Sequence, residues 1–282
     1  MANQCSTSLS VIICSMNRAD ALRRCLNAIS PHEMQAVGGE LILVNNASTD
    51  QTEEVMRFFQ DHAAFPVEVI SEPIPGLARA RNAGLVRARG QTIVFTDDDC
   101  YLEAGYLLKA GSIFASKQFD YCGGKILLYD KSDAPYGCDL RETFQLIPPH
   151  SFIRTGELQG ANMIVHRRVV EKIGAFDPML GPGTPFRCED IEYCARASME
   201  GFVGAYVPDL VVFHHHGRKP GSDIASLAEL NDLGRGAYYM RFLLRGNLKF
   251  LKGWLRLSFH WHKRHAAVRE LHGALAYLFS RR

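Results

Sequence analysis

The sequence predicts an α/β fold in which helices cover both faces of a largely parallel sheet. In the first hundred of the 282 residues, short apolar runs alternate with segments whose apolar residues recur at helical spacing. The fourth apolar run ends in three consecutive aspartates, Asp97–Asp99. Because ligands of such sheets bind beyond the carboxyl ends of the strands, we expect a ligand site at this edge.

The N-terminal half alternates strands and helices. Runs rich in β-branched and large apolar residues predict four strands, at Leu9–Ile13, Glu40–Val44, Val67–Ser71 and Thr92–Thr96. Helical spacing predicts three helices between them, at Asp20–Ile29, from Gln51 onward after the capping residue Asp50, and at the basic segment Leu77–Arg89.

The second half is less regular. A helix is expected at Ala104–Ser116, and the glycines and prolines of residues 121–160 predict a loop-rich section. The remaining expected elements are a strand at 160–165, the helix Arg167–Ile173 ended by Gly174, the loop Gly181–Pro185, the helix Ile191–Met199 and the strand Leu210–Phe213.

Composition is that of a globular protein, with 47% hydrophobic and 22% charged residues. This length predicts one large domain or a domain with an appendage. The net charge is only +2, but the segment from Arg218 to Arg282 contains 13 Lys/Arg against four Asp/Glu. The last quarter is therefore basic and the rest acidic, which indicates that the C-terminal segment meets something anionic.

Eight cysteines, at positions 5, 14, 25, 100, 122, 138, 188 and 194, form no C-x-x-C pair. They predict buried, reduced thiols rather than a disulfide framework or a zinc ribbon. The N-terminus has no cationic region before its apolar stretch, and the apolar runs fall short of the ~18 residues that span a bilayer. We expect a cytoplasmic protein, soluble or bound to the inner face of the cell membrane.

Three groups of polar residues carry the candidate chemistry: Asp97–Asp99 at a strand end, Glu189–Asp190 at a helix start, and His214–His216 after a strand. Each has a structural alternative: a solvated turn, helix capping and a polar sheet edge, respectively. Strand alternation places His214 and His216 on one face. Together the three groups indicate a metal-assisted transferase.

Over about residues 8–218, the chain resembles the family-2 glycosyltransferases of the GT-A fold, because it contains that family's motifs in the same order. The motifs are Val11–Arg18, Val44–Asp50, Ala80–Gly84 with Ala88–Gly90, Thr96–Asp99 as the D-x-D site, Gly160–Met163, Ile173–Asp177 and Cys188–Glu192. The resemblance implies a GT-A domain at 1–218, with a nucleotide-sugar half to about residue 100 and an acceptor half at 101–218. Residues 219–282 are expected to form a basic amphipathic helical tail.

The resemblance implies a divalent cation on the diphosphate of a nucleotide-sugar donor. Asp99 is the implied ligand, with His214 chosen over His216, and Asp97 and Asp98 are expected to reach the ribose or the sugar. Carboxylate oxygens suit Mg²⁺ or Mn²⁺, and a nitrogen ligand favours Mn²⁺ somewhat.

The other donor contacts are expected from the ends of the first two strands and from the basic helix. The implied residues are Ser15, Asn17, Asn46, Arg79 and Arg81. The chain has Asn45–Asn46 where two aspartates are usual, which leaves the choice between uridine and deoxythymidine donors open. For either arginine, a solvated helix face is the alternative.

The resemblance assigns the general base of an inverting transfer to Asp190, supported by Glu189, with Gly160 and Asn162 at the acceptor. The acceptor is expected to be a saccharide or a lipid-linked molecule in polysaccharide or glycolipid assembly. A single acceptor-side carboxylate argues against the two-carboxylate site of a glycoside hydrolase.

Three other functions are compatible with parts of the pattern. A sugar-nucleotide pyrophosphorylase would need a glycine-rich basic loop after the first strand, where this chain has Cys14–Arg18. A D-x-D phosphatase would carry its aspartates on the first strand. A non-catalytic nucleotide-sugar-binding scaffold is disfavoured by the presence of Asp99, Asp190 and His214 together.

The tail has two interpretations. Arg235–Arg282 contains eleven Lys/Arg and one acid, interleaved with aromatic residues and leucines. It either lies in a membrane interface or packs as terminal helix on the catalytic domain. No nucleic-acid partner is expected, because no recognition motif accompanies the charge.

Overall fold

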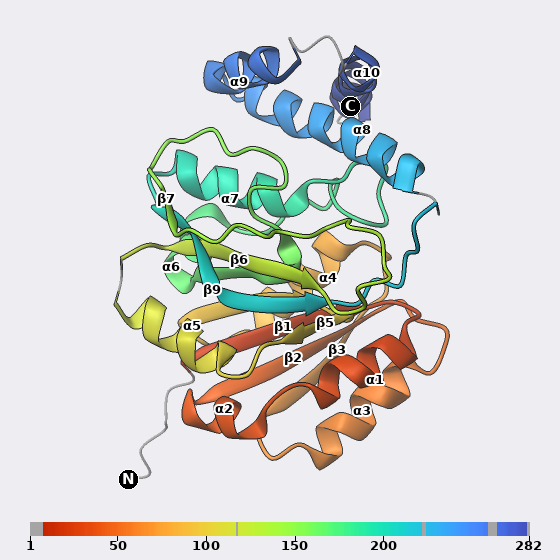
Figure 1. The fold of residues 1–282 in the computed structure, drawn as a ribbon, viewed down its shortest axis with the longest axis vertical. Coiled ribbons are helices and arrows are strands. Elements are labelled where there is room, and N and C mark those ends of the chain that lie inside the picture. The colour runs from red at the N-terminus through yellow and green to blue at the C-terminus, as the bar shows by residue number, and fades with distance from the viewer. Residues whose placement is uncertain (1–7, 117, 222–223, 259–263, 281–282) are drawn as a thin grey trace.

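The computed structural model describes residues 8–116, 118–221, 224–258 and 264–280. Its centre is one mixed sheet with the strand order β3-β2-β1-β4-β8-β6-β9-β5, and β7 pairs with β9 (Figure 1). The strands are β1 (Leu9–Ser15), β2 (Gly39–Asn46), β3 (Val67–Glu72), β4 (Thr92–Asp97), β5 (Cys100–Leu102), β6 (Tyr121–Leu128), β7 (Gln145–Ile147), β8 (Met163–His166) and β9 (Gly204–His214).

The first four strands confirm the predicted parallel half of the sheet. β1 pairs in parallel with both β2 and β4, and β2 pairs in parallel with β3. In this register Cys14 lies beside Asp97, and Ser15 lies beside Asn45. The polar residues at the three carboxyl ends are therefore neighbours at one edge, as expected for a ligand site.

The second half of the sheet differs from the prediction. Residues 160–162 form a 3₁₀ turn rather than a strand, and the strand begins at Met163. β8 runs antiparallel to β4 and β6, and β6 lies within the section expected to be rich in loops. β6 was not predicted because Gly123 and Gly124 interrupt its apolar pattern. A Cβ on Gly124 would lie 2.2 Å from the carbonyl oxygen of Leu210, so the close packing of these two segments requires glycine at this position.

Two apolar cores lie on opposite faces of the sheet, and β1 contributes alternate residues to them. Val11 and Ile13 face the core with α1 and α3, whereas Ile12 faces the core with α4 and α7. The helices of the two layers are α1 (Ala19–Asn27), α2 (Pro31–Ala36), α3 (Thr52–His62), α4 (Leu77–Arg87), α5 (Tyr106–Ala115), α6 (Arg167–Ile173) and α7 (Glu189–Met199). Those expected from sequence occur within a few residues of their predicted bounds.

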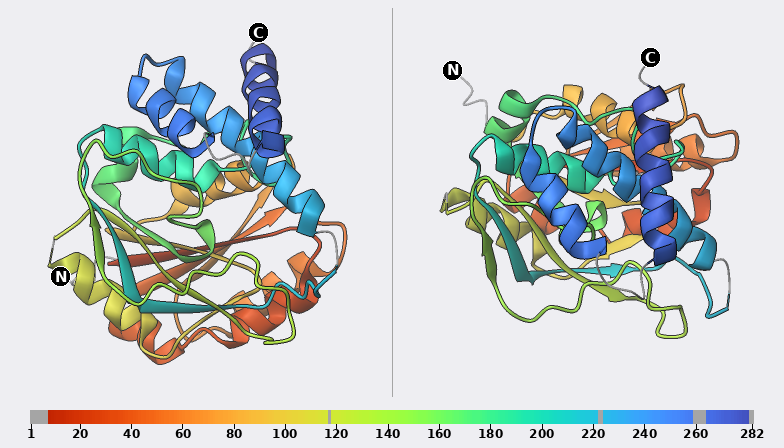
Figure 2. Two further views of the ribbon diagram at one scale, coloured as in Figure 1. Left: turned by 45° about the horizontal axis from the view of Figure 1, so that its top comes forward. Right: turned by 90° about the horizontal axis from the view of Figure 1, so that it is seen from above.

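The C-terminal segment forms three helices, α8 (Ile224–Leu243), α9 (Leu248–Ser258) and α10 (Arg264–Ser280). They lie together at one end of the molecule, beyond α7 (Figures 1 and 2). Tyr238, Tyr239 and Phe250 are buried in the core that also contains α4 and α7. These aromatic residues therefore pack on the layer that covers the sheet rather than facing a membrane. Phe259 and Trp261 lie outside the described residues.

A buried ion network joins α8 to the rest of the fold. Arg241 pairs with both Glu192 of α7 and Asp177, and each of these side chains is at least nine-tenths buried. A charge that loses its partner in such a place is strongly destabilising. The network therefore makes α8 an integral part of the domain's stability.

We expect Arg241→Ala to lower the free energy of unfolding by about 3–5 kcal/mol, because Glu192 and Asp177 would be left as buried carboxylates without this cation. Urea unfolding followed by circular dichroism measures the change. The matched control is Arg256→Ala on the exposed face of α9. Equal unfolding midpoints for the two variants would contradict the structural role of the network.

The seven cysteines among the described residues are free thiols, and Cys5 lies outside that part of the chain. Among the described residues, no helix is both long enough and apolar enough to cross a membrane.

Candidate active site

A cavity of about 660 Å³ opens where β1, β2 and β4 end. The polar residues predicted from sequence that line it are Ser15, Asn46, Arg81, Asp97, Asp98, Asp99, Gly160, Glu189, Asp190 and His214. Three predicted residues, Asn17, Arg79 and Asn162, are not part of the lining. The structure thus gathers residues from both halves of the sequence around one space.

The three aspartates have different environments, and Asp98 is the one most firmly tied to β1. It accepts a hydrogen bond from the Ser15 hydroxyl at 2.5 Å, and Arg18 Nε lies 3.0 Å from its other oxygen. Burial raises the pKa of Asp98 to about 7, the charge of Asp99 adds to this, and Arg18 opposes it. The contacts of Asp98 hold the strand ends together and place Arg18 at the cavity wall.

Asp99 faces His214. Its Oδ1 lies 3.3 Å from His214 Nε2, and its Oδ2 accepts a hydrogen bond from Arg18 at 2.5 Å. Burial would raise the pKa of Asp99, but the hydrogen bond and charge of His214, with Arg18 and Arg218, lower it to about 2. Asp99 is therefore the aspartate held most firmly as a carboxylate.

The donor atoms at this position fit a divalent cation. Asp99, Cys100 and His214 bring ligand atoms within 4.8 Å of one another. Burial raises the pKa of the Cys100 thiol well above its usual range, so it stays protonated and is a poor ligand for a hard cation. The remaining carboxylate and imidazole are donor groups that suit Mn²⁺ or Mg²⁺.

Arg81 connects the two acidic sides of the cavity. One guanidinium nitrogen lies 2.9 Å from Glu189 Oε1, and the other lies 3.2 Å from Asp97 Oδ1. The side chain is 3% exposed, and a Cβ on Gly160 would lie 2.4 Å from it, so glycine is required there. Burial raises the pKa of Asp97, and Arg81 opposes this. Arg81 thus forms a cationic bridge between the two acidic sides of the cavity.

Asp190 lies in the first turn of α7 and is half-buried at the cavity wall. Its Oδ2 accepts the backbone N–H of Gly160 at 2.8 Å, which fixes the carboxylate without an ion pair among the described residues. Its neighbour Glu189 is buried. Burial, followed by the charge of Asp190, raises the pKa of Glu189 to about 7, while Arg81 opposes the shift. The two acidic residues therefore differ, with Asp190 facing the cavity and Glu189 holding Arg81.

The structure gives Asn46 and Asn17 mainly structural contacts. The Asn46 amide donates to the carbonyls of Glu72 and Ile74 and accepts from Gly76 N–H at 2.8 Å. Asn17 Oδ1 accepts the backbone N–H of Thr49 at 2.7 Å, which joins the loops after β1 and β2. Arg79 is half-buried outside the cavity. Protein groups occupy both the amide nitrogen and oxygen of Asn46 and the amide oxygen of Asn17.

Asn162, which is predicted to contact the acceptor, lies outside the cavity lining. It is 1% exposed, and its amide donates to the carbonyls of Lys125 and Leu210 while accepting from the Tyr106 hydroxyl at 2.6 Å. Its side chain satisfies backbone groups where β6 and β9 separate at a bulge. A motif position alone could not distinguish this role from acceptor binding.

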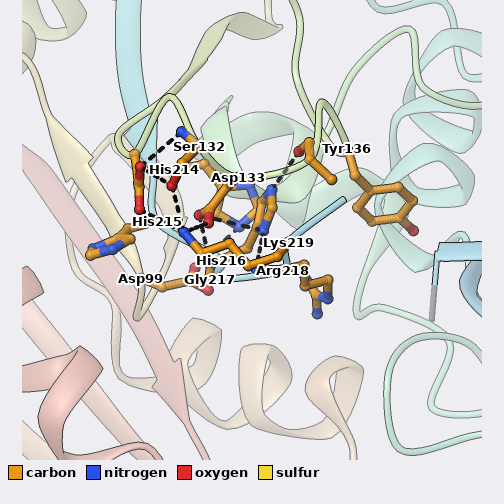
Figure 3. Close-up of polar contacts among 12 residues, drawn as sticks. Asp99, Ser132, Asp133, Tyr136, His214, His215, His216, Gly217, Arg218 and Lys219 are labelled. Carbon is orange, nitrogen blue, oxygen red and sulfur yellow. Dashed lines mark hydrogen bonds and ion pairs between the residues drawn. The ribbon is translucent and has the colours of Figure 1, made fainter. Parts of the chain in front are cut away.

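The segment after β9 is fixed by a neighbouring loop, as Figure 3 shows. The rings of His214 and His216 lie on one face with centroids 5.1 Å apart, but His216 is fully buried and its Nε2 lies 3.1 Å from the carbonyl oxygen of Ala134. Buried Asp133 accepts the N–H of Gly217 at 2.9 Å and pairs with Lys219 at 2.7 Å. These contacts place His214, rather than His216, beside Asp99.

Four arginines of the cavity wall were not predicted from sequence: Arg18, Arg187, Arg218 and Arg235 of α8. Arg18 lies three residues after the end of β1 and pairs with Asp98 and Asp99, and Arg218 lies two residues after His216. The position of a cation just after each of these strands is a signal that could have identified both. Arg187 lies two residues before Glu189 in a loop, where no periodicity predicts the direction of its side chain.

Comparison with known proteins identifies relatives of this chain. The family described as "Glycosyl transferase family 2" matches residues 10–174, more than half of the chain. Glycosyltransferase AglE of Haloferax volcanii is 26% identical over 210 residues, which cover 73% of this chain and 66% of AglE. The chain spans 18% of glycosyltransferase GlyA of Streptococcus pneumoniae, at 28% identity over 130 residues.

Solved structures share the fold. The mannosyltransferase PcManGT from Pyrobaculum calidifontis, in complex with GDP-Man and Mn²⁺, gives a TM-score of 0.63 at 17% identity and covers 95% of this chain and 74% of its own. Staphylococcus aureus TarS 1-349 in complex with UDP-GlcNAc gives 0.57 at 17% identity, covering 94% of this chain and 80% of its own. Likeness at this level of identity establishes the GT-A-like architecture.

Proposed function

The chain belongs to glycosyl transferase family 2, and from that premise we propose that it moves a sugar from a UDP- or dTDP-sugar to a hydroxyl acceptor with inversion. The observation that carries this proposal is one cavity lined by Asp99 and His214 on one side and by Asp190 on the other. Arg81 bridges the two sides through Asp97 and Glu189. A donor and an acceptor can therefore meet in one space.

On the donor side, Asp99 and His214 would hold Mn²⁺ or Mg²⁺. When bound, the ion supplies Lewis-acid neutralisation of the diphosphate charge. The presence of Mn²⁺ and GDP-Man in the PcManGT complex supports a similar use of this fold. Asp97, at the end of β4 and beside Arg81, is the carboxylate that we assign to the donor's sugars, while Asp98 acts by holding Ser15 and Arg18.

On the acceptor side, we assign the general base to Asp190. Its carboxylate would take the proton of the acceptor hydroxyl while that oxygen forms a bond to the anomeric carbon. The bond between that carbon and the diphosphate oxygen breaks, and the nucleoside diphosphate leaves with the electron pair. Gly160 orients the carboxylate through its N–H, and Glu189 acts through Arg81 rather than on the acceptor.

The acceptor is proposed to be a saccharide or a lipid-linked molecule of polysaccharide or glycolipid assembly. The basic surface of the C-terminal helices supports contact with the inner face of a cell membrane.

Asp133 is proposed as a positioning residue for His214, because it holds Gly217 and Lys219. We expect Asp133→Ala to weaken Mn²⁺ binding about 10–100-fold, the range for a lost outer contact of a metal ligand. Titration of Mn²⁺ followed by electron paramagnetic resonance measures this without any turnover. Asp130→Ala is the matched control, since Asp130 also pairs with Lys219 at 2.7 Å but has a side chain that is 38% exposed, whereas that of Asp133 is fully buried. Equal affinities in both variants would exclude the positioning role.

The function is tested by a thermal-stability screen of nucleotide sugars with Mn²⁺, followed by detection of the released nucleoside diphosphate with a panel of acceptors. We expect one class of donor to stabilise the protein and to be consumed. A donor that stabilises the protein but is never consumed would instead favour the non-catalytic scaffold.

A further inference from the structure

The exposed face of α9 carries a leucine stripe. Leu248, Leu251 and Leu255 are 64%, 37% and 51% exposed, and Leu244 in the preceding turn is also exposed. Residues three and four positions apart lie on one side of a helix, so the three leucines of α9 form a continuous apolar face. Exposed apolar stripes of this kind mark surfaces that bind a partner.

The orientation of α9 is set by its opposite face. Phe250 is fully buried and stacks on Phe242 of α8, with ring centroids 3.9 Å apart. Trp254 Nε1 donates a hydrogen bond to Glu270 of α10 at 2.7 Å. Because one face of α9 already packs on the protein, the leucine stripe points away from the fold. The leucine stripe is therefore an apolar surface in addition to the face through which α9 packs on the protein.

Cations flank the leucines. Residues 244–258 contain Arg245, Lys249, Lys252 and Arg256 and no acidic residue. At the turn between α8 and α9 they border a hollow of about 450 Å³, lined by Arg245, Gly246, Asn247, Leu248, Lys249 and Lys252. A hollow with three cations beside a leucine face matches the chemistry of a lipid phosphate joined to its acyl chains.

We propose that this surface, the leucine stripe and cations of residues 244–256, docks on a bilayer containing anionic lipids. The leucines would enter the boundary of the acyl region, and the cations would meet the phosphates. A second copy of the chain is the poorer occupant, because a symmetric contact would set four cations against four. The surface lies at the end of the molecule formed by α8, α9 and α10, beyond the sheet and α7 (Figures 1 and 2).

This surface gives the tail a different membrane contact from the one that the sequence suggests. The aromatic residues Tyr238, Tyr239 and Phe250 are inside the protein, and the leucines are outside. The biological role of this docking, but not the docking itself, rests on the proposed function. α8, which precedes α9, contributes Asn231 and Arg235 to the lining of the active-site cavity. Docking through α9 would keep a wall of the cavity near the bilayer, where a lipid-linked acceptor is held.

The test is co-sedimentation of the full chain with vesicles of phosphatidylcholine alone or with 30% phosphatidylglycerol, without nucleotide or metal. We expect binding to the anionic vesicles that weakens at high salt. The pair Leu251→Ser and Leu255→Ser should reduce the partition coefficient about tenfold for each leucine. The pair Lys252→Ser and Arg256→Ser should reduce it about fivefold for each cation, on anionic vesicles only.

The matched control is Val86→Ser on α4, where the side chain is 83% exposed. It should bind as the wild type does. The inference is overturned if the wild type does not bind anionic vesicles, if the leucine pair binds as the control does, or if light scattering shows that the leucine pair instead dissociates an oligomer. Because donor stabilisation is measured without vesicles, loss of vesicle binding with an intact donor response would overturn this inference and leave the proposed function standing.

Discussion

Replacement of Asp190 by asparagine should abolish glycosyl transfer while leaving donor binding near the wild-type value. The amide keeps the shape of the carboxylate and can still accept the Gly160 N–H, but it cannot take a proton from the acceptor hydroxyl. Loss of a general base typically lowers the rate about 10²–10⁴-fold. The rate of nucleoside diphosphate release in the presence of acceptor measures the effect.

The control is Asp209→Asn, which changes an exposed aspartate. It should leave both donor binding and turnover unchanged. Turnover by the Asp190 variant within a few-fold of this control would remove Asp190 from the role of base. Another carboxylate of the cavity would then have to act as the base, and Glu189 is the remaining candidate on the acceptor side.

Replacement of Asp99 by asparagine should remove high-affinity binding of Mn²⁺. Asp99 is the aspartate that faces His214, and it is the one whose pKa the surroundings lower. An amide offers a neutral oxygen in place of an anionic one. We therefore expect the Mn²⁺ affinity to fall by more than the roughly 10–100-fold that results from removing an outer contact of a metal ligand. Titration of Mn²⁺ by calorimetry, in the absence of donor, measures it.

Asp98→Asn separates the roles of the two adjacent aspartates. Asp98 contacts Ser15 and Arg18 and has no contact with His214 among the described residues. Its variant should bind Mn²⁺ nearly as the wild type does, although the β1 edge loses its ion pair with Arg18. If instead Asp98→Asn loses Mn²⁺ and Asp99→Asn keeps it, the assignment of the metal ligand is wrong.

The first half of the fold is predictable from sequence because its strands are continuous apolar runs. Ile12 has a side chain in one core and Val11 and Ile13 in the other, so the strand reads as uniformly apolar. β6 was not predictable in this way, since Gly123–Gly124 lie where neighbouring chain segments approach too closely for a side chain. Packing between segments far apart in sequence determined that strand.

The site shows the same division. Residues at or just after strand ends, such as His214 and Asp99, could be placed from sequence because strand ends meet at one sheet edge. Side-chain partners could not be placed, since they depend on distant loops. The Asn162 amide donates hydrogen bonds to backbone carbonyls of two other segments. The ion pair of Arg81 with Glu189 joins residues that are 108 positions apart.

The cavity is proposed to bind a nucleotide-sugar donor through a divalent cation held by Asp99 and His214. The most direct measurement is a calorimetric titration of UDP, dTDP and GDP into the wild-type protein with Mn²⁺, repeated with EDTA. We predict saturable binding of at least one nucleotide with Mn²⁺ and its loss with EDTA. Binding of equal affinity with and without the metal, or no binding of any of the three nucleotides, would contradict the claim.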